Sequence, residues 1–295
     1  MRIFVTGASG WIGSAVVTEL VEAGHAVVGL ARSESAAVIV AGLGAEVLRG
    51  DLEDLDSLRT GAAASDGVIH LGYNHDFSRM GDAAATDLAA ITAIGDALEG
   101  TGHPLLIASG VLGLATGRAA AEQDVPDSAA HPRVANAAAT LALAERGVRP
   151  LVVRFAPTVH GPGDHGFVAV LTAVAREKGV AAYIEDGANR WPAVHRLDAA
   201  DLVRRAVESA PSGSVLHAAA EEGIPTRSIA EAIGRSLDLP VASIAAADAA
   251  AHFGWIGNFF GADTAASSTL TRQLLDWTPA QQGLIADLDA GLYVR

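Results

Sequence analysis

Short runs of apolar and β-branched residues alternate with longer alanine-rich segments along the first half of the chain. The short runs are typical of buried strands in a parallel sheet, and apolar positions three and four residues apart predict amphipathic helices. The predicted strands are Arg2–Val5, Ala26–Leu30, Glu46–Leu48, Gly67–Leu71, Leu105–Ala108 and Leu151–Arg154. The predicted helices between them include Trp11–Ala23 and Ala83–Leu98. This alternation predicts an α/β fold with a doubly wound parallel sheet of the Rossmann type.

The pattern changes after Pro157, where glycine and proline interrupt a chain with predicted helices at Val168–Lys178, Ala199–Ser209 and Arg227–Leu237. We interpret residues 1–157 as a dinucleotide-binding Rossmann domain. Residues 158–295 are interpreted as mainly a smaller C-terminal substrate-binding lobe, with some segments that return to the main domain. Because no repeat, low-complexity tract or linker separates the two parts, we expect close packing with a cleft between them.

Charge and composition exclude several classes of partner. The 295 residues include 34 acidic and 20 basic side chains, and this formal net charge of -14 disfavours nucleic acid and anionic membrane surfaces. The absence of cysteine excludes disulfides, thiolate metal sites and thiol nucleophiles. With no signal-peptide pattern and no apolar stretch long enough for a membrane span, we expect a cytoplasmic protein. The histidines lack the spacing of a helical zinc site, so no metal is expected.

A glycine-rich turn lies between the first predicted strand and the first predicted helix, where residues 5–13 read Val-Thr-Gly-Ala-Ser-Gly-Trp-Ile-Gly. Gly7 permits a tight turn, Gly10 lets the backbone approach a pyrophosphate, and Gly13 permits close helix packing. The helix N-terminus adds free N–H groups and the positive end of the helix dipole. The segment therefore predicts a dinucleotide site, and its alternative is a βα turn with a purely structural role.

The residue after the second strand bears on the choice of dinucleotide. An NAD-preferring site usually has a carboxylate there, whereas this chain has Arg32 followed by Ser33. A guanidinium pairs with a 2′-phosphate and a serine hydroxyl adds a hydrogen bond, which predicts NADP(H) as the cofactor with NAD as the alternative. Glu34 is close enough to compete for Arg32, which would leave a solvated arginine at a helix start.

Segments beyond this turn resemble those of the extended short-chain dehydrogenase/reductase family, also called the NAD-dependent epimerase/dehydratase family, and more closely its atypical members. The matching segments are Gly50-Asp51-Leu52, His70-Leu71-Gly72, Ala108-Ser109, Arg154–Gly161 and Val194–Asp198. The resemblance covers nearly the whole chain. It implies that residues 51–52 hold the adenine, that residues 71–72 flank the cofactor, and that residues 156–159 line the nicotinamide.

The predicted cofactor-binding residues are Gly7, Ser9, Gly10, Trp11, Ile12, Gly13, Arg32, Ser33, Asp51, Leu52, Leu71, Gly72, Ala156, Pro157, Thr158 and Val159. Two residues in these segments have structural alternatives. Asp51 is also placed to cap a helix that starts near Leu55. His70 ends an apolar strand, which is more typical of a buried core histidine than of a catalyst.

The chain departs from the family's catalytic pattern. That pattern is a tyrosine followed four residues later by a lysine, with a serine after the fifth strand that polarises the substrate. Ser109 is present, but Arg133 stands at the tyrosine position and Ala137 at the lysine position. An arginine holds its protons near neutral pH, so Arg133 either hydrogen-bonds an oxygen at the site or is a surface residue early in a helix.

A replacement proton donor is expected among Tyr73, His75, His160 and His195, of which the first two follow the fourth strand. A phenol or an imidazole can donate a proton as hydride arrives from a nicotinamide. The predicted catalytic residues are Ser109, Tyr73, Arg133 and His75.

These features favour an NADP(H)-dependent oxidoreductase that transfers hydride to or from a small organic substrate, a carbonyl, activated alkene or imine, in the cleft between the lobes. The alternatives are an epimerase or dehydratase with retained NAD, and a non-catalytic NAD(P)-binding redox sensor. Ser109, the loop Ala156–Gly161 and the segment Asn189–Trp191 would all be dispensable in a sensor, so their presence favours an enzyme. Asn189–Trp191 is interpreted as a wall of the substrate pocket, although Trp191 equally fits a core position. The resemblance also implies a homodimer through helices around Ala83–Leu98 and Val134–Glu145.

Overall fold

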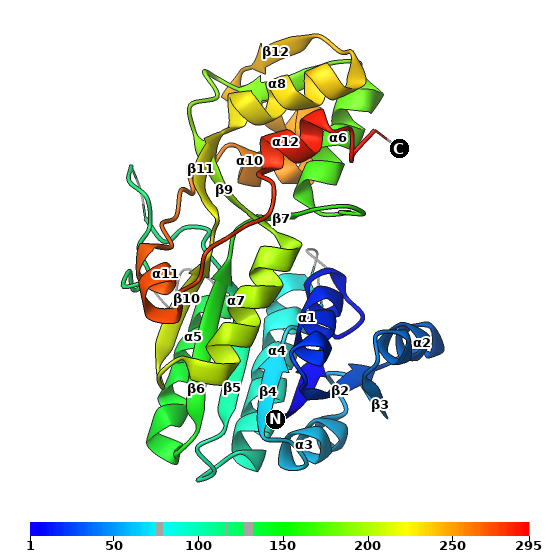
Figure 1. Cartoon of the computed structure of the whole chain (residues 1–295). Helices are drawn as coiled ribbons and strands as arrows, with labels where there is room; N and C mark the ends of the chain where they lie inside the picture. The colour runs from blue at the N-terminus through cyan, green and yellow to red at the C-terminus, as the bar shows by residue number, and fades with distance from the viewer. Residues whose placement is uncertain (75–78, 116, 127–131, 295) are drawn as a thin grey trace.

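The computed structural model describes residues 1–74, 79–115, 117–126 and 132–294. Its larger lobe is built on a seven-stranded sheet in the order β10-β6-β5-β4-β1-β2-β3, in which every pair of neighbours is parallel (Figure 1). The strands are β1 (Arg2–Thr6), β2 (Ala26–Ala31), β3 (Glu46–Arg49), β4 (Gly67–His70), β5 (Pro104–Gly110), β6 (Arg149–Phe155) and β10 (Ser214–Ala218). The predicted doubly wound Rossmann sheet is confirmed.

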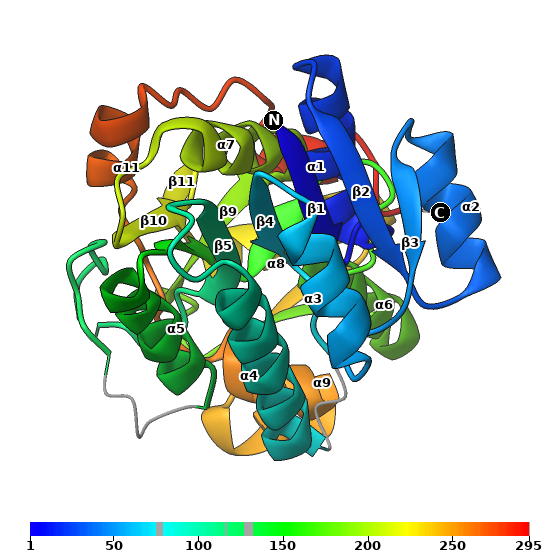
Figure 2. The same cartoon turned by 90° about the horizontal axis from the view of Figure 1, so that it is seen from below.

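Helices cover both faces of this sheet, as the view from below shows (Figure 2). One face carries α1 (Trp11–Glu22), α2 (Glu34–Gly42) and α7 (Arg196–Ser209), and the other carries α3 (Leu55–Ala63), α4 (Met80–Ala97) and α5 (Pro132–Ala142). Side chains of β1 alternate between the two cores, with Ile3 and Val5 packed beneath α1 and Phe4 packed beneath α3 and α4. Burial on both faces explains why the strands read as nearly continuous apolar runs.

The six predicted strands match β1 to β6. At most of the strand ends, the predicted and observed bounds differ by one or two residues. The seventh strand, β10, was not predicted because its short sequence Ser-Val-Leu-His-Ala lacks a long apolar run. β10 joins the sheet by pairing with β6, whose residues lie about sixty positions earlier in the chain.

The smaller lobe contains a three-stranded sheet, a two-stranded sheet and several helices (Figure 1). The strands are β7 (Thr158–His160), β8 (Ala181–Ile184), β9 (Arg190–His195), β11 (Glu221–Pro225) and β12 (Val241–Ile244). The helices are α6 (Phe167–Lys178), α8 (Thr226–Leu237), α9 (Ala249–Phe253), α10 (Gly257–Phe260) and α12 (Leu284–Asp289). Trp191, Phe260 and Ile229 lie in the core that these elements share.

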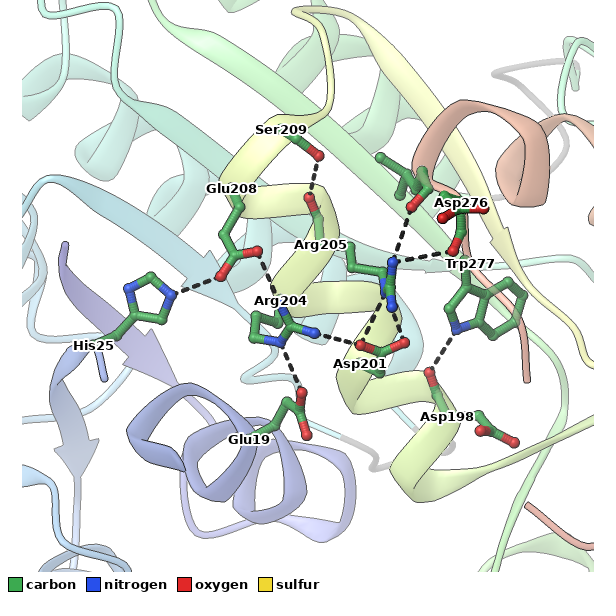
Figure 3. A network of polar contacts seen from close by, with 11 residues as sticks. Glu19, His25, Asp198, Asp201, Arg204, Arg205, Glu208, Ser209, Asp276 and Trp277 are labelled. Carbon is green, nitrogen blue, oxygen red and sulfur yellow. Dashed lines mark hydrogen bonds and ion pairs between the residues drawn. The ribbon is translucent and has the colours of Figure 1, made fainter. Parts of the chain in front are cut away.

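The two lobes are linked because the chain crosses between them more than once. After β9 it returns to the large sheet through α7 and β10, and α11 (Thr269–Leu275) packs near this edge. Figure 3 shows polar contacts around α7, where Arg204 binds Glu19 of α1 and the Trp277 indole N–H donates to the Asp198 carbonyl at 3.1 Å. Residues 158–295 therefore contribute to both lobes. Within the described residues, no helix combines the length and apolar character needed to cross a membrane.

Candidate dinucleotide and catalytic site

The turn after β1 leaves room for a ligand only because its glycines lack side chains. Gly7 has a φ of +68°, and a Cβ built there would lie 2.7 Å from the Gly72 nitrogen. A Cβ on Gly13 would overlap the Gly7 carbonyl oxygen, so α1 packs directly on the turn. Gly10 N donates to the Gly7 carbonyl at 2.9 Å and closes the loop. This backbone cradle fits a pyrophosphate.

Helix α1 begins at Trp11 without a side-chain cap, because its N-cap residue is Gly10. The N–H groups of the first turn are therefore available to an anion at the positive end of the helix. Ser9, Trp11 and Ile12 are half-buried around this end. The Trp11 indole also connects the lobes, since its Nε1 donates to the Val159 carbonyl at 2.7 Å.

A face of the same indole is covered by a cation. The Arg196 guanidinium lies 4.1 Å from the centre of the Trp11 ring and donates to Ser14 Oγ at 3.2 Å. Burial lowers the pKa of Arg196 from its ordinary value. These contacts make Trp11 a structural link between α1, β7 and the start of α7, a role that the glycine motif alone does not reveal.

Arg32 is exposed at the carboxyl end of β2, beside the glycine turn of residues 5–13, which we call the phosphate loop. Its predicted competitor Glu34 pairs instead with Arg49, at 3.3 Å. Ser33 caps α2 by accepting a hydrogen bond from Ala36 N at 3.2 Å, so its hydroxyl has a structural role as well. The sheet places Arg49 beside Ala31, which brings a second guanidinium to this rim. Sequence reasoning missed Arg49, although a basic residue before Gly50-Asp51 was a visible signal.

Asp51 organises the turn after β3 but does not cap α3. Its Oδ1 accepts from Glu53 N at 2.8 Å and from Asp54 N at 3.1 Å, while the helix cap is Asp54. The expected capping role of Asp51 is therefore wrong by three residues, because the turn uses the first aspartate and the helix the second. The Leu52 side chain lies close to the point where a Cβ on Gly72 would be. This contact places residues 51–52 next to the phosphate loop.

The segment from the end of β6 into β7 also lies at this rim. Ala156 is buried and its N–H donates to the Ala218 carbonyl at 3.1 Å, whereas Pro157 and Val159 are half-buried. The Thr158 hydroxyl is buried and has no hydrogen-bond partner within the described part of the chain. A buried hydroxyl without a partner costs free energy, so a polar ligand group that bonded Thr158 would offset this cost. These residues fit the expected dinucleotide.

Tyr73, Ser109 and Arg133, which are far apart in the sequence, are brought together at the carboxyl ends of β4 and β5. The Arg133 guanidinium lies 4.1 Å from the centre of the Tyr73 ring, and its Nη2 donates to the Ala108 carbonyl at 3.1 Å. Ser109 follows Ala108 on β5 and is nearly buried. His75 lies outside the described residues.

Burial is the main influence on the Tyr73 phenol. It raises the pKa of Tyr73 above the ordinary value of 10.0, Arg133 partly opposes this, and the Asp87 carboxylate adds to it. The phenol is therefore protonated at neutral pH. Arg133 would stabilise the phenolate that remains after proton donation.

The two other histidine candidates are buried at the junction of the lobes. His160 Nδ1 lies 2.7 Å from Asp287 Oδ2, and His195 Nδ1 accepts from Leu197 N at 3.2 Å. Burial first, and then neighbouring His160, lower the pKa of His195. Both rings serve internal contacts, so neither is favoured as the proton donor.

The segment Asn189–Trp191 supports the small lobe from inside. Trp191 is fully buried and its Nε1 donates to the Phe259 carbonyl at 3.2 Å. The Asn189 amide donates to the Phe260 carbonyl at 2.7 Å, and Arg190 pairs with Asp263. For Trp191, the core interpretation holds and the pocket-wall interpretation is wrong. No group of three or more potential metal ligands occurs among the described side chains.

The fold and site define a class. A seven-stranded parallel sheet with its glycine turn after β1, followed by a smaller lobe, is the architecture of the extended short-chain dehydrogenase/reductases. The profile of the NAD dependent epimerase/dehydratase family matches residues 3–220. The chain belongs to this family, which consists of NAD(P)-dependent enzymes.

The chain is also similar to individual proteins. Over 294 residues the chain is 47% identical to "Uncharacterized protein C2A9.02" of Schizosaccharomyces pombe, covering 99% of this chain and 100% of the relative. It is 28% identical over 274 residues to a 4-hydroxy-2-methyl-3-oxo-4-farnesyl-3,4-dihydroquinoline-1-oxide ketoreductase of Stigmatella aurantiaca, covering 86% and 80% of the two chains. The UDP-glucose 4-epimerase structure from Thermotoga maritima has the same fold, with a TM-score of 0.79, 18% identity and coverage of 99% and 97%.

Proposed function

We propose that the protein is an NADP(H)-dependent oxidoreductase that transfers hydride to or from a small organic carbonyl, activated alkene or imine substrate. The observation that carries this proposal is the arrangement of Tyr73, Ser109 and Arg133. These residues combine a phenol, a hydroxyl and a fixed positive charge beside a phosphate loop. The Stigmatella aurantiaca relative, which is named as a ketoreductase, supports carbonyl reduction.

A dinucleotide held at the phosphate loop would supply hydride, and the chain's own residues would orient the substrate oxygen and donate the proton. For a carbonyl substrate, the Ser109 hydroxyl hydrogen-bonds to the carbonyl oxygen and orients it. The Arg133 guanidinium stabilises the negative charge that develops on this oxygen as hydride adds to the carbon. The Tyr73 phenol then donates its proton to the oxygen, which completes the alcohol, and is reprotonated from solvent.

The preference for NADP(H) rests on charge at the end of β2. Arg32 is exposed there and makes no ion pair within the described residues, while Arg49 lies on the neighbouring strand. A planar guanidinium is suited to bind a 2′-phosphate through two N–H groups. A carboxylate would be expected at this position for NAD.

The first experiment is a calorimetric titration with NADPH and NADH of the wild type and of Arg32→Ala. We expect NADPH to bind at least about tenfold more tightly than NADH, an advantage of about 1.4 kcal/mol, and the variant to lose it. Arg59→Ala is the control, because Arg59 is an exposed arginine on α3 that pairs with Asp56. An unchanged preference in Arg32→Ala would contradict the 2′-phosphate contact.

Turnover is then followed by NADPH absorbance with carbonyl, activated alkene and imine substrates. Oxidation of NADPH with any of them supports the oxidoreductase. Binding without turnover across the panel would favour a redox sensor, and NAD that remains bound through purification would favour an epimerase or dehydratase. Failure to bind either dinucleotide would contradict the proposed function as a whole.

A further inference from the structure

A continuous chain of buried hydrogen bonds runs from the phosphate loop to α5. The Gly72 N–H donates to Thr6 Oγ1 at 3.1 Å, and this oxygen lies 2.8 Å from His70 Nδ1. His70 Nε2 lies 3.2 Å from Asp87 Oδ1, and the other Asp87 oxygen accepts from the Asn136 amide at 2.7 Å. The side chains of this relay are Thr6, His70, Asp87 and Asn136, and all of them are buried.

One arrangement of protons gives each hydrogen bond of the relay a donor and an acceptor. An ionised Asp87 only accepts hydrogen bonds, so His70 Nε2 carries a proton toward it. His70 Nδ1 then accepts from the Thr6 hydroxyl, which itself accepts from Gly72 N–H. Asn136 uses its remaining amide proton to donate to the Ala84 carbonyl at 2.9 Å. With its proton on Nε2, His70 therefore supplies a donor toward Asp87 and an acceptor toward Thr6.

The two ends of the relay reach the two functional halves of the site. At one end, Gly72 packs against Gly7, where any Cβ would meet the Gly72 backbone. At the other end, Asn136 lies on α5 three residues after Arg133, which contacts Tyr73 and the Ala108 carbonyl. His70 and Asp87 come from β4 and α4, so the relay connects four elements through side chains alone.

We propose that His70 and Asp87 are positioning residues that couple the phosphate loop to the placement of α5 and its Arg133. In a buried network of this kind, a shift at one end disturbs the bonds at the other, because a buried polar group that loses its partner is costly and the neighbouring groups move to keep their bonds. A dinucleotide that orders the Gly7–Gly72 contact thereby also favours the α5 position that holds Arg133 over Tyr73. This inference rests on the proposed dinucleotide binding at the phosphate loop.

The coupling is tested by changing the end of the relay that is remote from the phosphate loop. We expect Asn136→Ala to weaken NADPH binding about fivefold, although Asn136 lies on α5, at the end of the relay that is remote from the phosphate loop. Thr140→Val is the matched control. Thr140 is also buried on α5, but among the described residues its hydroxyl bonds only the Asn136 carbonyl, at 2.9 Å, so NADPH affinity should stay within about twofold of wild type.

A double variant separates coupling from general damage to α5. In His70→Asn, the shorter amide retains a partner for Thr6 but no longer reaches Asp87. Asn136→Ala should therefore have almost no further effect on NADPH affinity in that background. If the two substitutions instead reduce affinity by independent factors that multiply, the relay does not couple α5 to the phosphate loop. The proposal is then overturned.

A second readout needs no dinucleotide. Hydrogen exchange at the Gly72 amide, measured in the ligand-free protein, should accelerate severalfold in Asn136→Ala and stay unchanged in Thr140→Val. Unchanged exchange in both variants would overturn the proposal that the relay couples Asn136 to the Gly72 amide. If the wild type bound neither NADPH nor NADH, the proposed function would fail, whereas the exchange result would still decide whether the relay transmits.

Discussion

Single glycines around the phosphate loop differ in the space that each leaves for a side chain. Gly13 has none, because its Cβ would overlap the Gly7 carbonyl oxygen, while Gly10 has a neighbouring oxygen at 3.1 Å. Gly42, at the end of α2, has no atom within 4 Å of the same position. The glycines of the phosphate loop therefore differ in steric restriction, and Gly13 is the most restricted of them.

The first prediction follows from this difference. Gly13→Ala should destabilise the protein by about 2 kcal/mol and weaken NADPH binding at least about tenfold, because α1 must move away from the turn. Gly42→Ala should leave affinity unchanged and raise stability by up to about 1 kcal/mol, since alanine is the better helix former. Urea unfolding and calorimetric titration measure both. A Gly13→Ala variant that binds normally would contradict the tight packing.

The second prediction concerns the Tyr73–Arg133 pair. Tyr73→Phe keeps the ring beneath the guanidinium but removes the acidic proton, so kcat with a carbonyl substrate should fall about 100-fold with little change in NADPH affinity. Arg133→Lys keeps the charge but loses the planar contact and the fork of N–H groups, so an intermediate loss is expected. Steady-state kinetics provide the measurement. Equal activity of wild type and Tyr73→Phe would remove Tyr73 as the proton donor.

At the scale of elements, helix α7 joins the lobes. Arg204 on α7 binds Glu19 of α1 at 2.7 Å, Asp201 at 2.6 Å and Glu208 at 2.9 Å (Figure 3). The Asp198 carboxylate, near the start of the same helix, accepts from Ala280 N and Gln281 N. Helix α7 thus holds both α1, which carries the phosphate loop, and the segment that leads to α12.

The third prediction tests the contribution of the Arg204 ion pairs on α7 to stability. Arg204→Met retains most of the apolar stem but removes three ion pairs, so the free energy of unfolding should fall by about 1 kcal/mol. Arg59→Met removes a single exposed pair with Asp56 and should change stability by less than about 0.5 kcal/mol. Chemical denaturation distinguishes the two. Identical small effects would mean that the α7 network contributes no more than a surface pair.

At the scale of the whole molecule, two buried histidines make stability depend on pH. Burial lowers the pKa of both His195 and His217. Each ring is therefore neutral in the native state at a pH where the unfolded chain binds a proton. As the pH falls through the ordinary histidine pKa of about 6.5, the unfolded state gains protons that the native state does not, so stability decreases.

The fourth prediction follows directly. The melting temperature should fall between pH 7.5 and pH 5.5, and the slope should be shallower in His217→Asn, whose amide can still donate to the Ser267 carbonyl that His217 Nδ1 contacts at 2.8 Å. His103→Asn is the control because His103 is only partly buried. Thermal unfolding at several pH values provides the data. A slope in His217→Asn as steep as that of wild type would contradict the assignment.

Local patterns were sufficient to predict much of the fold and part of the site. The strands β1 to β6 are apolar runs separated by helical segments. The glycines of the phosphate loop all lie within one stretch of nine residues, so their pattern is visible in the local sequence. Tyr73 and Ser109 could be selected because residues that follow parallel strands share one edge of the sheet. Whether the selected residues bind a cofactor or react is still a prediction.

Contacts between distant segments could not be predicted in this way. The pairing of Glu34 with Arg49, the burial of Trp191 and the Thr6–His70–Asp87–Asn136 relay each depend on which elements become neighbours. Hydrophobic periodicity reports which side of an element is apolar but not which partner will cover it.

The sequence alone determined the alternation of strands and helices and the glycine turn after β1, because these depend on backbone freedom and side-chain spacing over a few residues. The tertiary structure alone decided that Arg133 lies over Tyr73, that Trp11 meets Val159 and Arg196, and that β10 completes the sheet. The physical reason is that these contacts form only when helices and strands pack around a common core, which brings together side chains that are remote along the chain.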